Sequence, residues 1–179
     1  MNLLQITAKA QPYSKTDDRG LVAPHASVHL RIHVDGNELG CSHSINGEPV
    51  LDGLLLLATR EFGGEHFLLT CTCGVPECAR IDDPVLVRRS NTEVEWTFPA
   101  SYAEYLTAHG FGDLRFVFDR AAYDATLRRI HEFVEATEPL LALPACIGEP
   151  VSYHGDDYST QAARLRKWLP SLNDGSDGA

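Results

Sequence analysis

A strict alternation of apolar and polar side chains in residues 27–35 limits the fold more than any other feature of the sequence. A period of two is typical of a strand that buries one face. Asp35-Gly36 follows at once and has the composition of a tight turn. We therefore expect a half-buried strand that ends in a turn. The four apolar positions on its buried face are Val28, Leu30, Ile32 and Val34.

Other stretches have the same strand character, and they are grouped along the chain instead of alternating regularly with helices. Two of them are expected to be joined by a tight turn near Ser90-Asn91. Grouped strands of this kind favour an α+β fold with a mainly antiparallel sheet. The further strands are expected at residues 67–73, 84–89, 93–98 and 114–118.

Helices are predicted where a capping residue precedes an apolar or periodic stretch and a glycine or proline ends it. Ser101 and Glu104 have the spacing of a capping box, and Asp119 is expected to cap the longest helix. Three to four helices packed on the sheet are expected on this basis. They cover residues 54–58 after Asp52, residues 101–109, residues 120–138 before Pro139, and a stretch from Ser159 onward.

The chain length of 179 residues suits one hydrophobic core, so we expect a single domain. With 44% hydrophobic and 22% charged residues, the composition is that of a globular chain and not of a disordered one. We place the domain at residues 1–172 and a disordered tail at residues 173–179.

The charge balance restricts the partners that the chain can attract. Lys and Arg number 15 against 25 Asp and Glu, which gives a formal net charge of -10. Nucleic acids and anionic membranes attract cationic surfaces, so we expect neither as a partner. A negative field instead attracts a basic protein and speeds its encounter with the chain. The sequence shows no signal peptide and no apolar run long enough to span a membrane, so we expect a cytoplasmic protein.

Soft metal ligands cluster in one segment, residues 71–78, where Cys71, Cys73 and Cys78 have the spacing C-x-C-x4-C. The first two side chains would share one face of an extended strand. A turn containing Gly and Pro could then bring the third thiol back towards them. Zinc is the metal that such thiolates favour, and the segment is therefore a candidate zinc site.

Three thiolates leave a tetrahedral zinc ion one ligand short. Cys41 and His43 repeat the two-residue spacing and are the best source of the fourth ligand. A fourth protein ligand would make the site structural, whereas a water molecule would make it hydrolytic, with Glu77 as the general base. The other sources of a fourth ligand are His66, Cys146 and His154.

Two alternatives to zinc remain open for the same cysteines. Free cysteine is among the residue types that proteins bury most often, so the three thiols could be inert core residues. Two of them could instead form a disulfide, which in the cytosol would be a redox element.

The stretch 68–79, with Pro84-Val85 and Val94-Glu95-Trp96 beyond it, resembles a set of small uncharacterised bacterial proteins. These proteins have a similar C-x-C-G-x-P-x-C-A segment before a Trp-bearing strand. The resemblance implies a bacterial, cytosolic origin, and no known activity comes with it. Many members have Gly at the positions of Glu77 and Arg80, so the turn is expected to differ in this chain.

The sequence favours a role in binding over a role in catalysis. It contains no HExxH, P-loop, dinucleotide-binding or G-x-S-x-G motif. The leading hypothesis is an acidic, noncatalytic binding protein, such as an immunity protein or antitoxin that covers a basic toxin or enzyme. The alternative is a small zinc domain or zinc-dependent hydrolase, and a homodimer is open in either case. The aromatic residues considered as interface anchors are Trp96, Tyr102, Tyr105, Tyr153, Tyr158 and Trp168.

Overall fold

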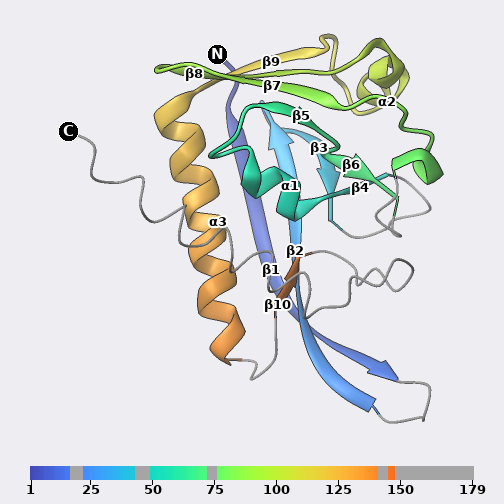
Figure 1. Ribbon diagram of the computed structural model, residues 1–179, viewed down its shortest axis with the longest axis vertical. Helices are drawn as coiled ribbons and strands as arrows, with labels where there is room; N and C mark the ends of the chain where they lie inside the picture. Colours follow the sequence, from blue (N-terminus) through green and yellow to red (C-terminus); the bar gives the residue numbers. More distant parts are fainter. Residues whose placement is uncertain (17–21, 43–48, 72–75, 141–144, 148–179) are drawn as a thin grey trace.

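The strand β2 is the centre of the first sheet (Figure 1). It pairs with β1 in antiparallel register from Leu4 opposite Val34 to Thr16 opposite Val22. Its other edge pairs with β3 at one end and, in parallel, with β10 near the middle. The strands of this sheet are β1 (Leu4–Thr16), β2 (Val22–Val34), β3 (Asn37–Cys41) and β10 (Ala145–Ile147). The computed structural model describes residues 1–16, 22–42, 49–71, 76–140 and 145–147.

The alternation in residues 27–35 is confirmed, since Val28, Leu30, Ile32 and Val34 are completely buried. The turn after β2 is also confirmed. Asp35 and Gly36 have φ values of 52° and 88°, as a two-residue hairpin turn requires. Asp35 also accepts hydrogen bonds from the backbone N–H of Leu3, at 2.7 Å, and from the side chain of Asn2, at 2.6 Å. These bonds lower the pKa of Asp35 and attach the start of the chain to the turn.

A second sheet has the strand order β5-β7-β8-β9, and every neighbouring pair in it is antiparallel. The two strands predicted around Ser90-Asn91 are confirmed as β7 and β8. Two short strands, β4 and β6, form a separate antiparallel pair. The bounds are β4 (Val50–Leu51), β5 (Gly64–His66), β6 (Leu69–Thr70), β7 (Val85–Arg89), β8 (Glu93–Thr97) and β9 (Arg115–Asp119).

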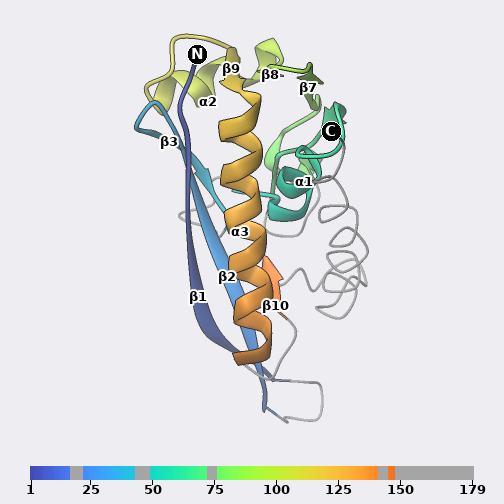
Figure 2. The ribbon, with the colours of Figure 1, turned by 90° about the vertical axis from the view of Figure 1, so that its left-hand side faces the viewer.

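Three α-helices lie within the described residues, so the predicted α+β fold is confirmed. The strands pair mainly in antiparallel fashion, but the described ones form three sheets instead of the single sheet predicted. The longest helix, α3, runs along the β1–β2 hairpin, as two perpendicular views show (Figures 1 and 2). The helices and 3-10 turns are α1 (Gly53–Ala58), η1 (Pro76–Ala79), η2 (Ala100–Tyr102), α2 (Ala103–Ala108) and α3 (Arg120–Leu140). The helix expected from Ser159 onward lies outside the described residues.

Two of the predicted helix caps are present. Asp52 accepts hydrogen bonds from the backbone N–H groups of Leu54 and Leu55, at 3.0 and 2.9 Å. Asp119 accepts one from Ala122 at 2.8 Å. Each carboxylate therefore satisfies N–H groups that the first turn of a helix leaves unpaired.

The capping box predicted at Ser101 and Glu104 is wrong, although a helix does follow. The residue that precedes α2 is Tyr102, and its side chain makes no capping hydrogen bond. Ser101 is inside the 3-10 turn η2 through which the chain enters α2, one position before the capping residue, so it cannot cap this helix. Its hydroxyl donates instead to Asp83, at 3.0 Å.

The strand predicted over residues 67–73 is confirmed for Leu69–Thr70, whereas Phe67, Leu68 and Cys71 are not in a strand and residues 72–73 lie outside the described residues. The backbone N–H of Leu68 donates to the carbonyl of His66 at 3.0 Å, so the chain turns sharply between β5 and β6. Leu68 and Leu69 are both 1% exposed, which departs from the alternation of a regular half-buried strand. Both leucines therefore belong to the hydrophobic core, whereas a half-buried strand would place one of them on the exposed face.

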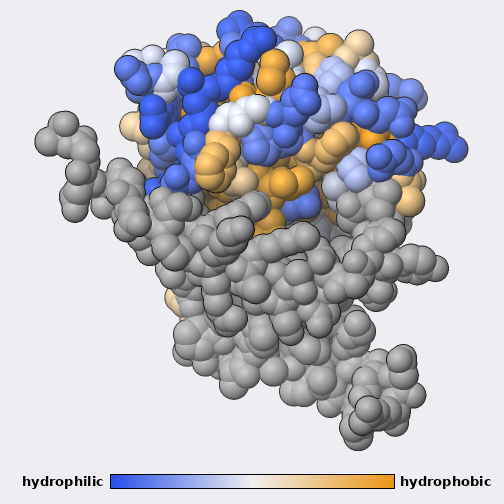
Figure 3. Space-filling model, viewed as in Figure 1, coloured by the Kyte–Doolittle hydropathy of each residue, from blue (hydrophilic) through white to orange (hydrophobic). Residues whose placement is uncertain are grey.

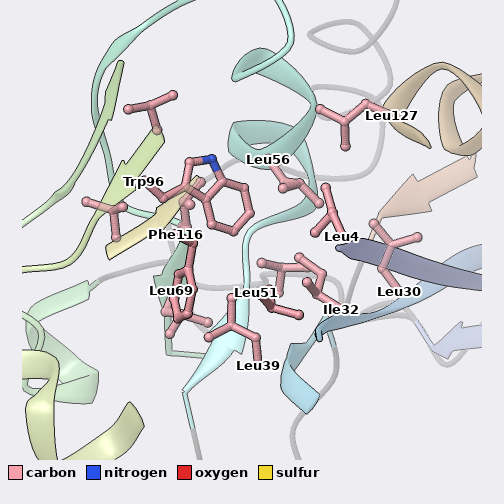
Figure 4. Packing of buried hydrophobic residues seen from close by; sticks show 14 of the residues in the cluster. Leu4, Leu30, Ile32, Leu39, Leu51, Leu56, Leu69, Trp96, Phe116 and Leu127 are labelled. Carbon is pink, nitrogen blue, oxygen red and sulfur yellow. The ribbon is translucent and has the colours of Figure 1, made fainter. Parts of the chain in front are cut away.

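The core joins the two sheets to α1 and α3 (Figure 4). Trp96 of β8 is completely buried and packs edge-on against Phe118 and Tyr123, with ring centroids 5.1 and 5.9 Å apart. The indole N–H of Trp96 donates to Tyr123 Oη at 3.2 Å, and Tyr123 in turn hydrogen-bonds to Thr59. The hydroxyl of Tyr123 therefore has partners on both sides, although it lies in the middle of the core.

Removing the Tyr123 hydroxyl tests this network. We expect Tyr123→Phe to lower the free energy of unfolding by about 1–3 kcal/mol, because the buried N–H of Trp96 would lose its acceptor. Thr107→Val removes an exposed hydroxyl from α2 and should change stability by less than about 0.5 kcal/mol. Urea denaturation of both variants measures the difference. Equal stabilities of the two variants would contradict the network.

Candidate functional site

The structure describes three of the five residues of the predicted zinc site. Cys71 directly follows β6, is half-buried and is disulfide-bonded. Cys78 is an exposed thiol in η1, and Cys41 is a buried thiol at the end of β3. Cys73 and His43 lie outside the described residues.

A sulfur atom in a disulfide is not a thiolate and cannot act as a thiolate ligand of zinc. The zinc prediction therefore applies to the chain with Cys71 reduced, and it stays a prediction. Within the ranges that the structure describes, no three His, Cys, Asp or Glu side chains gather closely enough to hold a metal ion.

A cavity of about 380 Å³ lies beside the cysteine segment, between β6, η1 and α2. This volume is in the range of small-ligand sites. The segment after Cys78 contributes Ala79 and Ile81 to the wall, so the predicted cysteine site and the cavity share one part of the chain. The apolar wall consists of Pro49, Leu69, Ala79, Ile81 and Ala108.

Tyr102 lines this cavity and has a buried hydroxyl group without a hydrogen-bond partner. The residue is only 4% exposed, and its ring packs edge-on against Phe98 at a centroid distance of 5.3 Å. Burial, aided by the nearby carboxylate of Asp83, raises the pKa of Tyr102 to about 12. The hydroxyl is therefore protonated at neutral pH and can both donate and accept a hydrogen bond.

An unpartnered buried hydroxyl carries a desolvation cost that no hydrogen bond offsets. Tyr123 shows the usual solution, because its hydroxyl is bonded on both sides. Tyr102 differs from Tyr123 in this respect and lies at a cavity wall instead of in the middle of the core. The oxygen of Tyr102 is itself enclosed by protein atoms, so other parts of the residue line the cavity.

Several carboxylates lie on or near one side of the cavity. Glu104 lines it, and Asp83 is held beside it by the hydrogen bond from Ser101. Asp82 and Glu77 are exposed in the neighbouring segments. Arg80 is the one Lys or Arg among the described residues that line the cavity, and it is exposed. The balance of charge around the opening is therefore negative.

The floor of the cavity is fixed to the first sheet through α2. Tyr105 donates its hydroxyl hydrogen to the carbonyl of Leu39 in β3, at 2.7 Å. His109 stacks on the Tyr105 ring at a centroid distance of 4.2 Å. A Cβ atom on Gly40 would lie 3.3 Å from Tyr105 Oη, so glycine at this position permits the close approach. These contacts hold the α2 side of the cavity in place.

The sequence indicates Tyr102 and Tyr105 only as aromatic residues suited to an interface, and it does not connect them with the cysteine segment. The structure brings both to one cavity next to that segment. Trp96, which belongs to the same group of aromatic residues, is completely buried in the core. Tyr153, Tyr158 and Trp168 lie outside the described residues.

Comparison with known proteins found no matching family model, no matching curated protein and no matching solved structure. The part of the chain that the structure describes contains no helix that is both long and apolar enough to cross a membrane.

Alkylation with iodoacetamide tests the state of the cysteines. In the native, unreduced protein we expect rapid labelling of Cys78, because its thiol is exposed, and no labelling of the disulfide-bonded Cys71. Cys41 should be labelled only after unfolding, because it is buried. Peptide mass mapping before and after reduction gives the result, with Cys78→Ser as the control that loses rapid labelling. Rapid labelling of Cys71 without a reductant would contradict the assignment.

Proposed function

We propose that this chain is a noncatalytic binding protein and that the cavity between η1 and α2 is its recognition site for a basic protein. A toxin or an enzyme whose active surface the chain covers is a partner of this kind. The observation that carries the proposal is an apolar wall with the carboxylates of Glu104 and Asp83 beside it. These two residues and the exposed Asp82 are called the rim.

The charge of the whole chain supports a basic partner. A net charge of -10 creates a negative field that attracts cations over long range, and the carboxylates near the cavity add to it locally. Figure 3 shows a face on which hydrophilic side chains cover much of the described part, with smaller hydrophobic patches between them. A surface with an excess of negative charge gives fast, salt-sensitive association with a basic protein and leaves most of the affinity to a few central contacts.

The cavity is suited to provide those central contacts. Interface energy concentrates where a partner's side chain enters a pocket and loses contact with water. The wall residues Leu69 and Ile81 are largely buried already, so an entering group would meet a formed surface. A partner that fills the cavity would also cover the exposed carboxylates around it.

Neutralising the rim tests the proposal. The variant Asp82→Asn, Asp83→Asn and Glu104→Gln removes three negative charges next to the cavity. The matched control, Glu65→Gln, Glu93→Gln and Glu132→Gln, removes three exposed charges from β5, β8 and α3, and none of these residues lines the cavity. Both variants are used as bait in extracts of the source cells at low and high salt.

We expect the unchanged chain and the control to retain a stoichiometric basic protein at low salt. The rim variant should bind this protein roughly tenfold more weakly, at up to about 0.5 kcal/mol per charge. High salt should weaken all three interactions. Equal retention by the rim variant and the control would show that the cavity rim is not the recognition site. The absence of a basic partner at either salt concentration would overturn the proposed function.

A further inference from the structure

We infer that a groove between β1 and α3 binds an extended, acidic segment of a partner, which pairs with the free edge of β1 as an additional strand. The juxtaposition behind this inference is a strand edge without a neighbour, a groove along that edge and two arginines on the opposite bank. The groove shares no lining residue with the cavity between η1 and α2, so it is a second interaction surface.

Beyond Leu3, one edge of β1 has no neighbouring strand among the described residues. The carbonyl of Leu3 faces the other edge, because it accepts from the N–H of Asp35, at 3.0 Å, at the end of β2. Asn2 faces the opposite way, since its N–H donates to Val117 of β9 at 2.6 Å. The direction of these groups alternates along a strand, so every second residue after Asn2 also directs its N–H and C=O away from β2. These residues are Leu4, Ile6, Ala8 and Ala10.

A groove of about 1220 Å³ follows this edge. It exists because the chain enters α3 directly after Asp119, so β9 covers only the start of β1, and α3 then runs beside β1 (Figure 2). Residues 1–7 all line the groove, as expected where the edge of a strand is accessible and not one face alone. The volume exceeds the usual range of small-ligand sites and suits a peptide.

The two banks of the groove leave room for an added strand. On the α3 side, Ala122 and Ala125 are exposed and have small side chains. On the β1 side, Ile6 is half-buried and Leu3 is 57% exposed. Apolar side chains of a bound segment would cover these two residues, while hydrogen bonds between the backbones would hold the segment in place.

The charges along the groove select an acidic segment. Arg128 and Arg129 line it from α3 and are exposed, and neither forms an ion pair within the part of the chain that the structure describes. Asp119 is the one Asp or Glu among the described lining residues, and its carboxylate already accepts the N–H of Ala122 at 2.8 Å. The groove is therefore locally positive on a chain whose net charge is -10, and it favours a segment that carries carboxylates.

The same charges oppose a second copy of this chain as the occupant. A second β1 would bring residues 4–10, which contain Lys9 and no Asp or Glu, next to Arg128 and Arg129. Like charges that face each other destabilise strand pairing. An exposed lysine on an edge strand is also a common means of preventing self-association. The occupant is thus a segment of a different chain.

The experiment is a titration of the full, isotopically labelled chain with the peptide Ac-EVEVEVE-amide, followed by backbone amide hydrogen exchange. One control peptide, Ac-KVKVKVK-amide, has the same alternation and the opposite charge. The other, Ac-EGEGEGE-amide, retains the carboxylates and lacks the apolar side chains. Chemical-shift changes give the dissociation constant of each peptide, at low and at high salt.

Four variants accompany the unchanged chain. The first combines Arg128→Gln with Arg129→Gln, and its matched control combines Arg80→Gln with Arg88→Gln, which removes two exposed arginines that do not line the groove. The third, Ala8→Pro, removes one N–H from the free edge and none from the pairing with β2. Its control, Ala8→Val, retains that N–H.

We expect the acidic peptide to bind with a dissociation constant in the submillimolar to millimolar range, because ordering an extended peptide offsets much of the gain. It should slow amide exchange at Leu4 and Ile6 and leave exchange at Gln5 and Thr7 unchanged, since only the first two face the added strand. The control peptides and the Arg128→Gln, Arg129→Gln variant should each show roughly fivefold weaker binding, and high salt should weaken binding of the acidic peptide. Ala8→Pro should weaken binding severalfold, whereas Ala8→Val and the matched arginine control should not.

Equal or tighter binding of the lysine peptide, unchanged affinity of the Arg128→Gln, Arg129→Gln variant, or absence of binding by the acidic peptide would each overturn the inference. Slow exchange of Leu4 and Ile6 before any peptide is added, becoming slower as the protein concentration rises, would overturn it in favour of a second copy. Because Arg128 and Arg129 are exposed, their variant remains informative even if Ala8→Pro does not fold.

Discussion

Burial of one face of β2 determines where the other elements of the structure lie. Its apolar residues are completely excluded from solvent, and β2 pairs with three other strands. The hairpin turn at Asp35-Gly36 sets the register of β3 against it. Leu39 of β3 then accepts the hydrogen bond from Tyr105 that holds α2. The position of the cavity is thus a consequence of the pairing of β2, transmitted through β3.

The cavity combines features that a structure optimised for stability alone would avoid. A buried hydroxyl without a partner costs free energy, and carboxylates close to one another repel. The core solves the same problem for Tyr123 by giving its hydroxyl two partners. Tyr102 also packs against an aromatic neighbour, Phe98, yet its buried hydroxyl has no hydrogen-bond partner. The two tyrosines therefore show that the fold leaves a polar group unsatisfied beside the cavity and not in the middle of the core.

Much of the fold can be predicted from local patterns. The strict alternation before Asp35-Gly36, the strands around Ser90-Asn91 and the cap at Asp52 are decided by neighbouring residues, and all three are confirmed. The long strand β1 is missing from the prediction, although residues 4–11 alternate between apolar and polar side chains. Two of the apolar positions are Ala8 and Ala10, and alanine is a weak strand former, so the pairing with β2 specifies this strand. The strand predicted over 67–73 begins too early, because a turn at residues 66–68 and burial of adjacent leucines override the local pattern.

The candidate site is predictable only in part. The sequence draws attention to Cys71 and Cys78, and the cavity indeed lies beside their segment. It cannot show that α2, more than twenty residues later in the chain, supplies the opposite wall. Nor can it reveal that the Tyr102 hydroxyl lacks a partner, since hydrogen-bond satisfaction depends on the tertiary arrangement.

The most direct measurement on this part of the structure is the free energy of unfolding of Tyr102→Phe. If the Tyr102 hydroxyl is buried without a partner, it contributes nothing to the stability of the isolated chain. Urea denaturation should therefore show that Tyr102→Phe is as stable as the unchanged chain or more stable. A loss of about 1 kcal/mol or more, typical of removing a hydrogen-bonded hydroxyl, would contradict this account of the cavity wall.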